Sequence, residues 1–154
     1  MAMEMHVLSD RRLGSIAEWQ RAIDAEGFPL WLAPDVELTA TQGFLPARLE
    51  RKQTGFECFH DDARKTMSFL GNEKFDHRWA NALGFRWTGD AAEMQAAWMA
   101  ATAYASATGG VVFDHQEGKV FTPLQAREIV SDIVRDLPAA EAIMEKIKGK
   151  FSAQ

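Results

Sequence analysis

Residues 90–121 read DAAEMQAAWMAATAYASATGGVVFDHQEGKVF, and this stretch decides the fold class of the chain. Asp90 stands three residues before a glutamate, the spacing of a helix-capping pair, and the alanine-rich run after it has high intrinsic helix propensity. The glycines at 109–110 end this helix. Two short runs rich in β-branched and aromatic residues, at 111–114 and 119–121, then predict a β-hairpin. A helix that leads directly into a hairpin indicates an α+β domain.

Two more helix starts carry the same signal. Ser15 precedes a glutamate by three residues and predicts a helix over 16–26, which Gly27 ends in the left-handed conformation that glycine favours. Thr122 precedes a glutamine by three residues and predicts a third helix, with a proline break before a last short helix at 139–148. Three helix starts can therefore be placed from the sequence.

Runs of aromatic and β-branched residues outside the helices predict strands. The clearest runs besides the hairpin are 6–8, 28–32, 54–60 and 79–87. Pro29 cannot donate a hydrogen bond to a central ladder, so 28–32 is predicted as an edge or terminal strand. Prolines and a glycine interrupt 33–53, which predicts a loop with one candidate strand at 36–38.

Residues 17–22 and 92–97 resemble each other, and each segment lies in a capped helix that is followed by a glycine and an apolar strand. Two strand-helix-strand units would pack as a ferredoxin-like sandwich, although two capped helices also share much of their first-turn chemistry by chance. We therefore expect one α+β domain over 1–154, with a single antiparallel or mixed sheet and helices packed on one face.

Composition argues against several classes of function. The chain has 154 residues and a formal net charge of −5, without a basic stripe, so nucleic acid is not the expected partner. No apolar run approaches the roughly 18 residues that span a bilayer, and the first residues lack a secretory pattern. Cys58 is the single cysteine and cannot form an internal disulfide. We expect a cytoplasmic protein that does not bind membranes.

The densest set of chemically active side chains lies around one predicted strand. Cys58 and His60 project to the same side of an extended chain and, with His77, could bind a metal ion. The alternative is a buried core cysteine and histidines that are hydrogen-bonded to carboxylates. Phosphate-binding, zinc-protease, hydrolase and calcium-binding motifs are absent from the sequence, so we expect no catalytic residue and no cofactor.

Acidic and aromatic residues offer a candidate surface for a protein partner. Tryptophan is favoured at binding hot spots, and carboxylates steer basic partners. The candidate partner-binding residues are Glu57, Asp61, Asp62, Asp76, Trp31 and Trp79. The tryptophans could equally belong to the core, where aromatic side chains of small domains are mostly buried.

One segment suggests a family. An alanine-rich helix from Ala96 leads into Thr108-Gly109-Gly110-Val111-Val112-Phe113-Asp114, then Glu117-Gly118-Lys119 and a capped helix at Thr122. This pattern resembles small bacterial immunity-type and uncharacterised α/β proteins. The resemblance implies a cytoplasmic protein that binds and neutralises a toxin domain, and it assigns no recognition residue to this chain.

Three functional hypotheses follow. The leading one is a small acidic binding protein without enzymatic activity, an immunity protein that neutralises a basic bacterial toxin domain. The alternative is a small enzyme or metal-binding protein that uses Cys58, His60 and His77. The third is a homodimer joined through the edge strand at 28–32, since unpaired sheet edges invite pairing.

Overall fold

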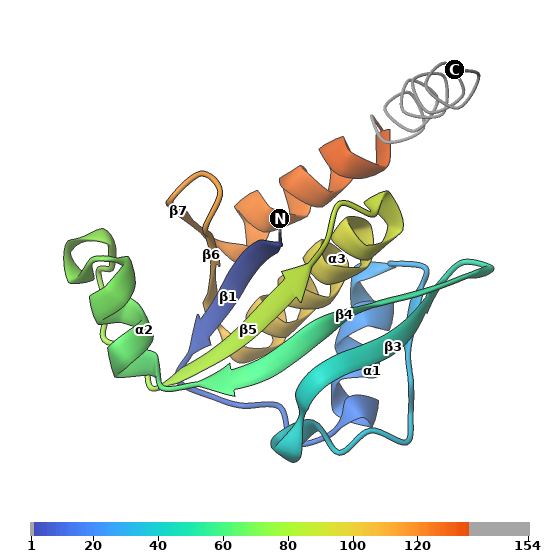
Figure 1. Cartoon of the computed structure of the whole chain (residues 1–154), viewed down its shortest axis with the longest axis horizontal. Helices are drawn as coiled ribbons and strands as arrows, with labels where there is room; N and C mark the ends of the chain where they lie inside the picture. The colour runs from blue at the N-terminus through green and yellow to red at the C-terminus, as the bar shows by residue number, and fades with distance from the viewer. Residues whose placement is uncertain (1, 136–154) are drawn as a thin grey trace, which may run out of the picture.

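A computed structural model describes residues 2–135 of the chain. Its centre is one antiparallel sheet of seven strands in the order β2-β3-β4-β5-β1-β6-β7 (Figure 1). The strands are β1 (Met3–Ser9), β2 (Leu30–Leu32), β3 (Gln42–Leu49), β4 (Lys52–Asp61), β5 (Asn81–Trp87), β6 (Val111–Asp114) and β7 (Lys119–Phe121). The predicted α+β class with a single sheet is confirmed.

The helices divide unequally between the two faces of the sheet. They are α1 (Ile16–Glu26), α2 (Ala63–Leu70), α3 (Ala91–Thr108) and a helix at 123–135, with short 3₁₀ turns at Leu38–Ala40 and Asn72–Lys74. The helices α1, α3 and 123–135 share one hydrophobic core with the sheet. In contrast, α2 buries Ala63 and Met67 against Leu8 and Ala82 on the opposite face. The predicted one-sided packing thus holds for every described helix except α2.

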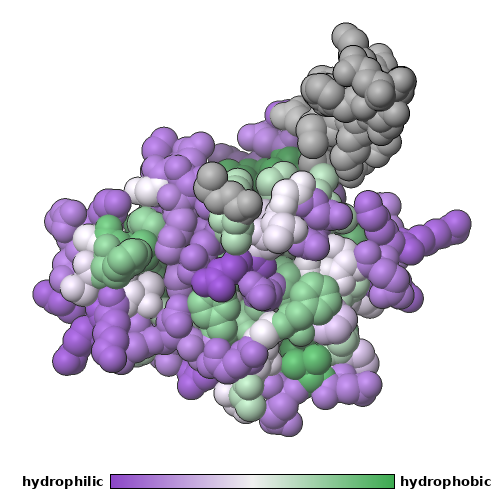
Figure 2. Space-filling view, in the orientation of Figure 1, coloured by the Kyte–Doolittle hydropathy of each residue, from purple (hydrophilic) through white to green (hydrophobic). Residues whose placement is uncertain are grey.

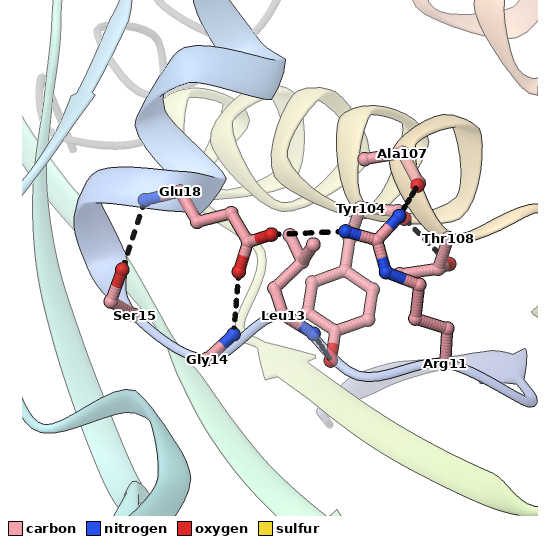
Figure 3. Close-up of polar contacts among 8 residues, drawn as sticks. All are labelled: Arg11, Leu13, Gly14, Ser15, Glu18, Tyr104, Ala107 and Thr108. Atoms are coloured by element: carbon pink, nitrogen blue, oxygen red, sulfur yellow. Dashed lines mark hydrogen bonds and ion pairs between the residues drawn. The ribbon is translucent and has the colours of Figure 1, made fainter.

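The start of α1 is capped as the sequence predicts (Figure 3). The Ser15 Oγ accepts a hydrogen bond from the Glu18 N–H at 3.1 Å, and the Glu18 carboxylate accepts one from the Gly14 N–H at 2.8 Å. The same carboxylate binds the Arg11 guanidinium at 3.1 Å, which also donates to the Ala107 carbonyl in the last turn of α3 at 3.2 Å. The cap therefore also connects α1 to α3.

The core is built around the alanine-rich α3, whose small side chains let it lie close to the sheet. The Trp19 indole of α1 donates to the Ala100 carbonyl of α3 at 2.9 Å. Its ring meets Phe56, Phe85 and Tyr104 edge-on. Aromatic pairs in this arrangement add roughly 0.5–1.5 kcal/mol to the free energy of area burial. The two main helices and the sheet are thus joined at one aromatic centre.

The loop predicted over 33–53 is present only up to residue 41, because β3 occupies 42–49 and β4 begins at Lys52. Residues of β3 alternate between exposed and buried from Phe44 to Leu49, as in a strand with one face in the core, and the candidate strand at 36–38 is absent. Pro46 obscured this pattern. Its carbonyl accepts from the Ala33 N–H at 3.0 Å, but it has no N–H with which to return the bond, so the β2–β3 pairing ends at Leu32.

Two other boundaries differ from the predictions. Asp62, interpreted from the sequence as part of an acidic surface, caps α2 by accepting from the Lys65 N–H at 2.9 Å. The strand predicted over 79–87 begins instead at Asn81, and Trp79 precedes it. The last helix predicted at 139–148 lies outside the described residues.

The predicted internal repeat corresponds to part of the topology. The strands β5 and β6 flank β1 and are connected by α3, which is the split β-α-β arrangement of ferredoxin-like folds. After α1, however, the chain enters β2 at the edge of the sheet, which confirms the edge position predicted for 28–32.

Within residues 2–135, no helix combines the length and apolar character that crossing a membrane requires.

Candidate functional site

The face of the sheet away from α1 and α3 is partly uncovered. Side chains alternate along each strand, so Met5, Val7 and Phe85 enter the core while their neighbours point to the other side. Figures 1 and 2 view the molecule from this uncovered side, where hydrophobic patches lie between hydrophilic groups. The cluster of titratable groups described next lies on this face.

Three side chains form a hydrogen-bonded line across this face. The Asp61 carboxylate lies 2.7 Å from His6 Nε2, and His6 Nδ1 lies 2.8 Å from His115 Nε2. Asp61 ends β4, His6 lies in the middle of β1, and His115 directly follows β6. His6 is only 3% exposed. A central strand thus supplies a buried imidazole that has a partner on each ring nitrogen.

Small residues on the intervening strand let Asp61 reach His6. Strand β5 lies between β4 and β1, and it places Ala82 and Gly84 beside Asp61 and His6. A Cβ at Gly84 would lie 2.2 Å from the Phe59 ring, so only glycine leaves room for this ring beside the β5 backbone. The Phe59 ring then meets His6 edge-on. The site therefore depends on small residues at these two positions of β5.

The contacts of His6 favour one tautomer of its ring. The Asp61 carboxylate accepts from His6 Nε2–H, and in this tautomer His6 Nδ1 keeps a lone pair. That lone pair faces His115 Nε2. Burial is the largest cause of a lowered pKa at His115, while Glu4 and Asp61 act in the opposite direction. Neutral imidazoles are the form that binds metal ions.

Glu4 adds a carboxylate to the pair of histidines. It lies two residues before His6 and on the same side of β1. One potential ligand atom from each of Glu4, His6 and His115 lies within 4.8 Å of the others. The Arg86 guanidinium stacks over Phe59 and is 3.7 Å from the Glu4 carboxylate, with which it forms a long ion pair.

A cavity of about 310 Å³ opens beside this cluster. Its first wall includes Glu4, His6 and His115, and its second wall is formed by α2 with Lys65 and Phe69. The site is therefore accessible to a small molecule.

The side chains that the sequence suggested as metal ligands, Cys58, His60 and His77, each lie in a different environment. Cys58 lies in the core, where burial raises the pKa of its thiol. His60 has both nitrogens engaged, since Nε2 donates to the Leu38 carbonyl at 2.8 Å and Nδ1 accepts from Arg12 at 2.9 Å. His77 binds Asp10 at 2.6 Å. Within residues 2–135, the group with metal-binding geometry is Glu4, His6 and His115 instead.

The acidic residues suggested for partner binding largely have partners within the chain. Glu57 faces Arg86 at 3.8 Å, Asp61 binds His6, and Asp62 caps α2. Asp76 is exposed and lines a groove beside β7. Asp61 is thus the one predicted site residue that belongs to the histidine cluster.

The two candidate tryptophans differ in exposure. Trp31 on the edge strand is 43% exposed, with the Arg48 guanidinium 4.9 Å from its ring centre. Trp79 is half-buried and packs edge-on against His77. The structure therefore offers Trp31, rather than Trp79, as an exposed aromatic group.

Sequence reasoning missed Glu4, His6 and His115. The spacing of Glu4 and His6 was visible, since alternate residues of a strand share a face. His115, however, lies 109 positions after His6, and only the pairing of β1 with β6 brings the two together. Comparison with protein-family models, curated proteins and solved structures finds no match to this chain.

Proposed function

We propose that this protein binds a divalent transition-metal ion of the zinc class through Glu4, His6 and His115. The observation that carries this proposal is the direct approach of His6 Nδ1 to His115 Nε2 at 2.8 Å, with Asp61 on the far nitrogen of His6. Two imidazoles and a carboxylate are a common ligand set for zinc and iron. The proposal belongs to the metal-binding alternative considered from the sequence, but with different ligands.

The separation of the two nitrogens is close to what a shared ion needs. Two nitrogens bound to one zinc ion at about 2.05 Å and a tetrahedral angle lie about 3.3 Å apart. The imidazoles therefore need to separate by about 0.5 Å from their present 2.8 Å and to tilt so that both nitrogen lone pairs point at one ion. Because His115 follows β6 in a turn, it can make this adjustment while His6 stays fixed in β1. The ion would replace the hydrogen that the two rings now share.

Asp61 is placed to orient the His6 ring. Histidine ligands usually donate their second ring N–H to a carboxylate, which fixes the ring and makes the ligand nitrogen more basic. The 2.7 Å contact from His6 Nε2 to Asp61 has this arrangement. The buried position of His6 means that this ligand is ordered before an ion arrives, which reduces the entropic cost of binding.

Isothermal titration of the full chain with zinc chloride tests this function, with native mass spectrometry to count bound ions. We expect one zinc ion per chain, and roughly 100-fold or greater loss of affinity in His115→Ala. His115 is the preferred position because it is less buried than His6, and Glu4→Gln provides a second variant. The matched control is His77→Ala, which removes an exposed histidine outside the cluster. Equal zinc affinities of His115→Ala and His77→Ala would overturn the proposal.

Binding of a protein partner is the second candidate, because Trp31 stays exposed on the edge strand beside an open groove of about 440 Å³. A toxin domain and a cytoplasmic location, which the resemblance implies, belong to this candidate, as does the basic partner that the net charge of −5 favours. After affinity capture of a partner by the wild-type protein, we expect Trp31→Ala to weaken that complex at least tenfold and Trp79→Ala to leave it nearly unchanged. Equal affinities of the two variants would contradict a hot spot at Trp31.

A further inference from the structure

The cavity beside the cluster gives a bound ion an open side. Zinc sites with three protein ligands keep a fourth position for water or an exogenous ligand, whereas structural zinc sites have four protein ligands. Glu4, His6 and His115 all line the cavity of about 310 Å³, a volume at the small end of the range for ligand pockets. A ligand entering this cavity would therefore reach the ion directly.

The opposite wall of the cavity combines an apolar ring with a cation. Phe69 is 87% exposed, the highest value among the large hydrophobic side chains of the described residues, and Leu70 lies beside it in the lining. Lys65 lines the same cavity and forms no salt bridge with any residue between 2 and 135. A ligand with an apolar body and an anionic head would complement both groups.

The charges around the cavity limit that ligand to a single negative charge. The lining contains three carboxylates, of Glu4, Asp61 and Asp62, and one cation, Lys65. A divalent ion brings this set to neutrality. A monoanion can then exchange for the ion's water and approach Lys65, while a dianion would also experience the excess of carboxylates.

We infer that the metal-loaded site binds a small monocarboxylate with an apolar body, its carboxylate on the ion and near Lys65 and its body against Phe69. This inference rests on the proposed metal binding. The helix α2 has eight residues and buries only Ala63 and Met67. Its shallow anchoring allows it to adjust around such a ligand.

Benzoate is the probe, titrated calorimetrically into the full chain with and without bound zinc. We expect benzoate to bind the zinc-loaded protein at least tenfold tighter than the zinc-free protein. It should also bind tighter than the neutral benzyl alcohol and the dianionic phenyl phosphate. In the zinc-loaded protein, Lys65→Met should weaken benzoate binding about tenfold. Arg64→Met, one position earlier on α2 and outside the cavity lining, is the matched control.

The outcomes separate the two proposals. Zinc binding without benzoate binding, or equal benzoate affinities of Lys65→Met and Arg64→Met, would overturn the ligand inference alone. Tighter binding of phenyl phosphate than of benzoate would overturn the preference for a monoanion. Failure to bind zinc at Glu4, His6 and His115 would overturn the proposed function and this inference together.

Discussion

Asp61 determines which nitrogen of His6 can bind an ion, because its carboxylate holds the hydrogen on Nε2. We predict that Asp61→Asn lowers zinc affinity about 10- to 100-fold, the range seen when a carboxylate behind a histidine ligand is removed. The side chain is 39% exposed, so the variant should still fold. The control is Glu57→Gln, on the same face of β4, and zinc titration measures both variants. Equal losses of zinc affinity in the two would show that general surface charge, not the contact with His6, is the cause.

Gly84 is the residue whose lack of a side chain gives Phe59 its place. An alanine Cβ would lie between 2.2 and 2.8 Å from three atoms of the Phe59 ring. The ring must then move and lose its position under Arg86, so we predict that Gly84→Ala lowers the free energy of unfolding by about 1–3 kcal/mol. Urea denaturation measures the change. Gly89→Ala is the control, since its Cβ would meet nothing within 4 Å, and an equal effect there would refute the steric explanation.

The site itself was largely beyond sequence reasoning, for a physical reason. Spacing rules find groups that lie close along one chain segment, and they led to Cys58 and His60. Those two residues do share a face of β4, but it is the face turned toward the helices, where Cys58 enters the core. Which face of a strand is uncovered depends on how distant elements pack, and a pattern of alternation alone does not contain that information.

At the scale of elements, one ion pair attaches the helix 123–135 to the end of α1. Arg127 donates two hydrogen bonds to the Glu26 carboxylate, at 2.6 and 2.8 Å. The hydrogen bond from Arg127 lowers the pKa of Glu26 and outweighs the effect of desolvation. Because the Arg127 side chain is 41% exposed, solvent screening limits the contribution of the pair to about 1 kcal/mol.

The lowered pKa of Glu26 gives this contribution a definite pH dependence. It is fully present above the unfolded-state value near 4.5 and is lost as the pH falls through the lower folded-state value. We predict that Glu26→Gln is less stable than wild type by about 1 kcal/mol at pH 7 and that the difference disappears in acid. Urea denaturation across this range tests it. Glu117→Gln, which removes an exposed pair with Lys119, should change little, and a pH-independent effect of Glu26→Gln would exclude the ion pair as its cause.

A side chain of α1 occupies backbone hydrogen-bonding groups of the edge strand β2. The Gln20 amide of α1 donates to the Leu30 carbonyl and accepts from the Leu32 N–H, both at 2.8 Å, as a neighbouring strand would. This arrangement occupies backbone groups that a second chain would need for a dimer through β2. We predict that Gln20→Ala self-associates more strongly than wild type in sedimentation velocity. Arg21→Ala, next to it on α1, is the control and should self-associate no more than wild type. Dimerisation of the wild-type protein through β2 would contradict this role of Gln20.

Element prediction succeeded where local chemistry determines the structure. The caps at Ser15 and Thr122 and the left-handed Gly27 involve groups within a few residues, and all are present in the structure. The strand β3 was missed because Pro46 normally argues against a strand, and its missing N–H is tolerated only where β2 ends. Such tolerance depends on a partner strand that lies elsewhere in the sequence.

At the scale of the whole molecule, strand order creates the uncovered face. Placing β1 between β5 and β6 brings the N-terminal strand beside a turn more than 100 residues later, and α1 and α3 both cover the opposite face. The fold class could be predicted from helix caps and apolar patterns. The order could not, because seven strands admit many pairings that satisfy the same patterns.

Anomalous diffraction at the zinc absorption edge, from crystals of the full chain grown with zinc, tests the central claim most directly. We predict one strong peak about 2.0–2.2 Å from His6 Nδ1, His115 Nε2 and a Glu4 carboxylate oxygen, with the Asp61 contact to His6 retained. A peak at His60 or His77 in place of this cluster, or no peak between His6 and His115, would contradict the account.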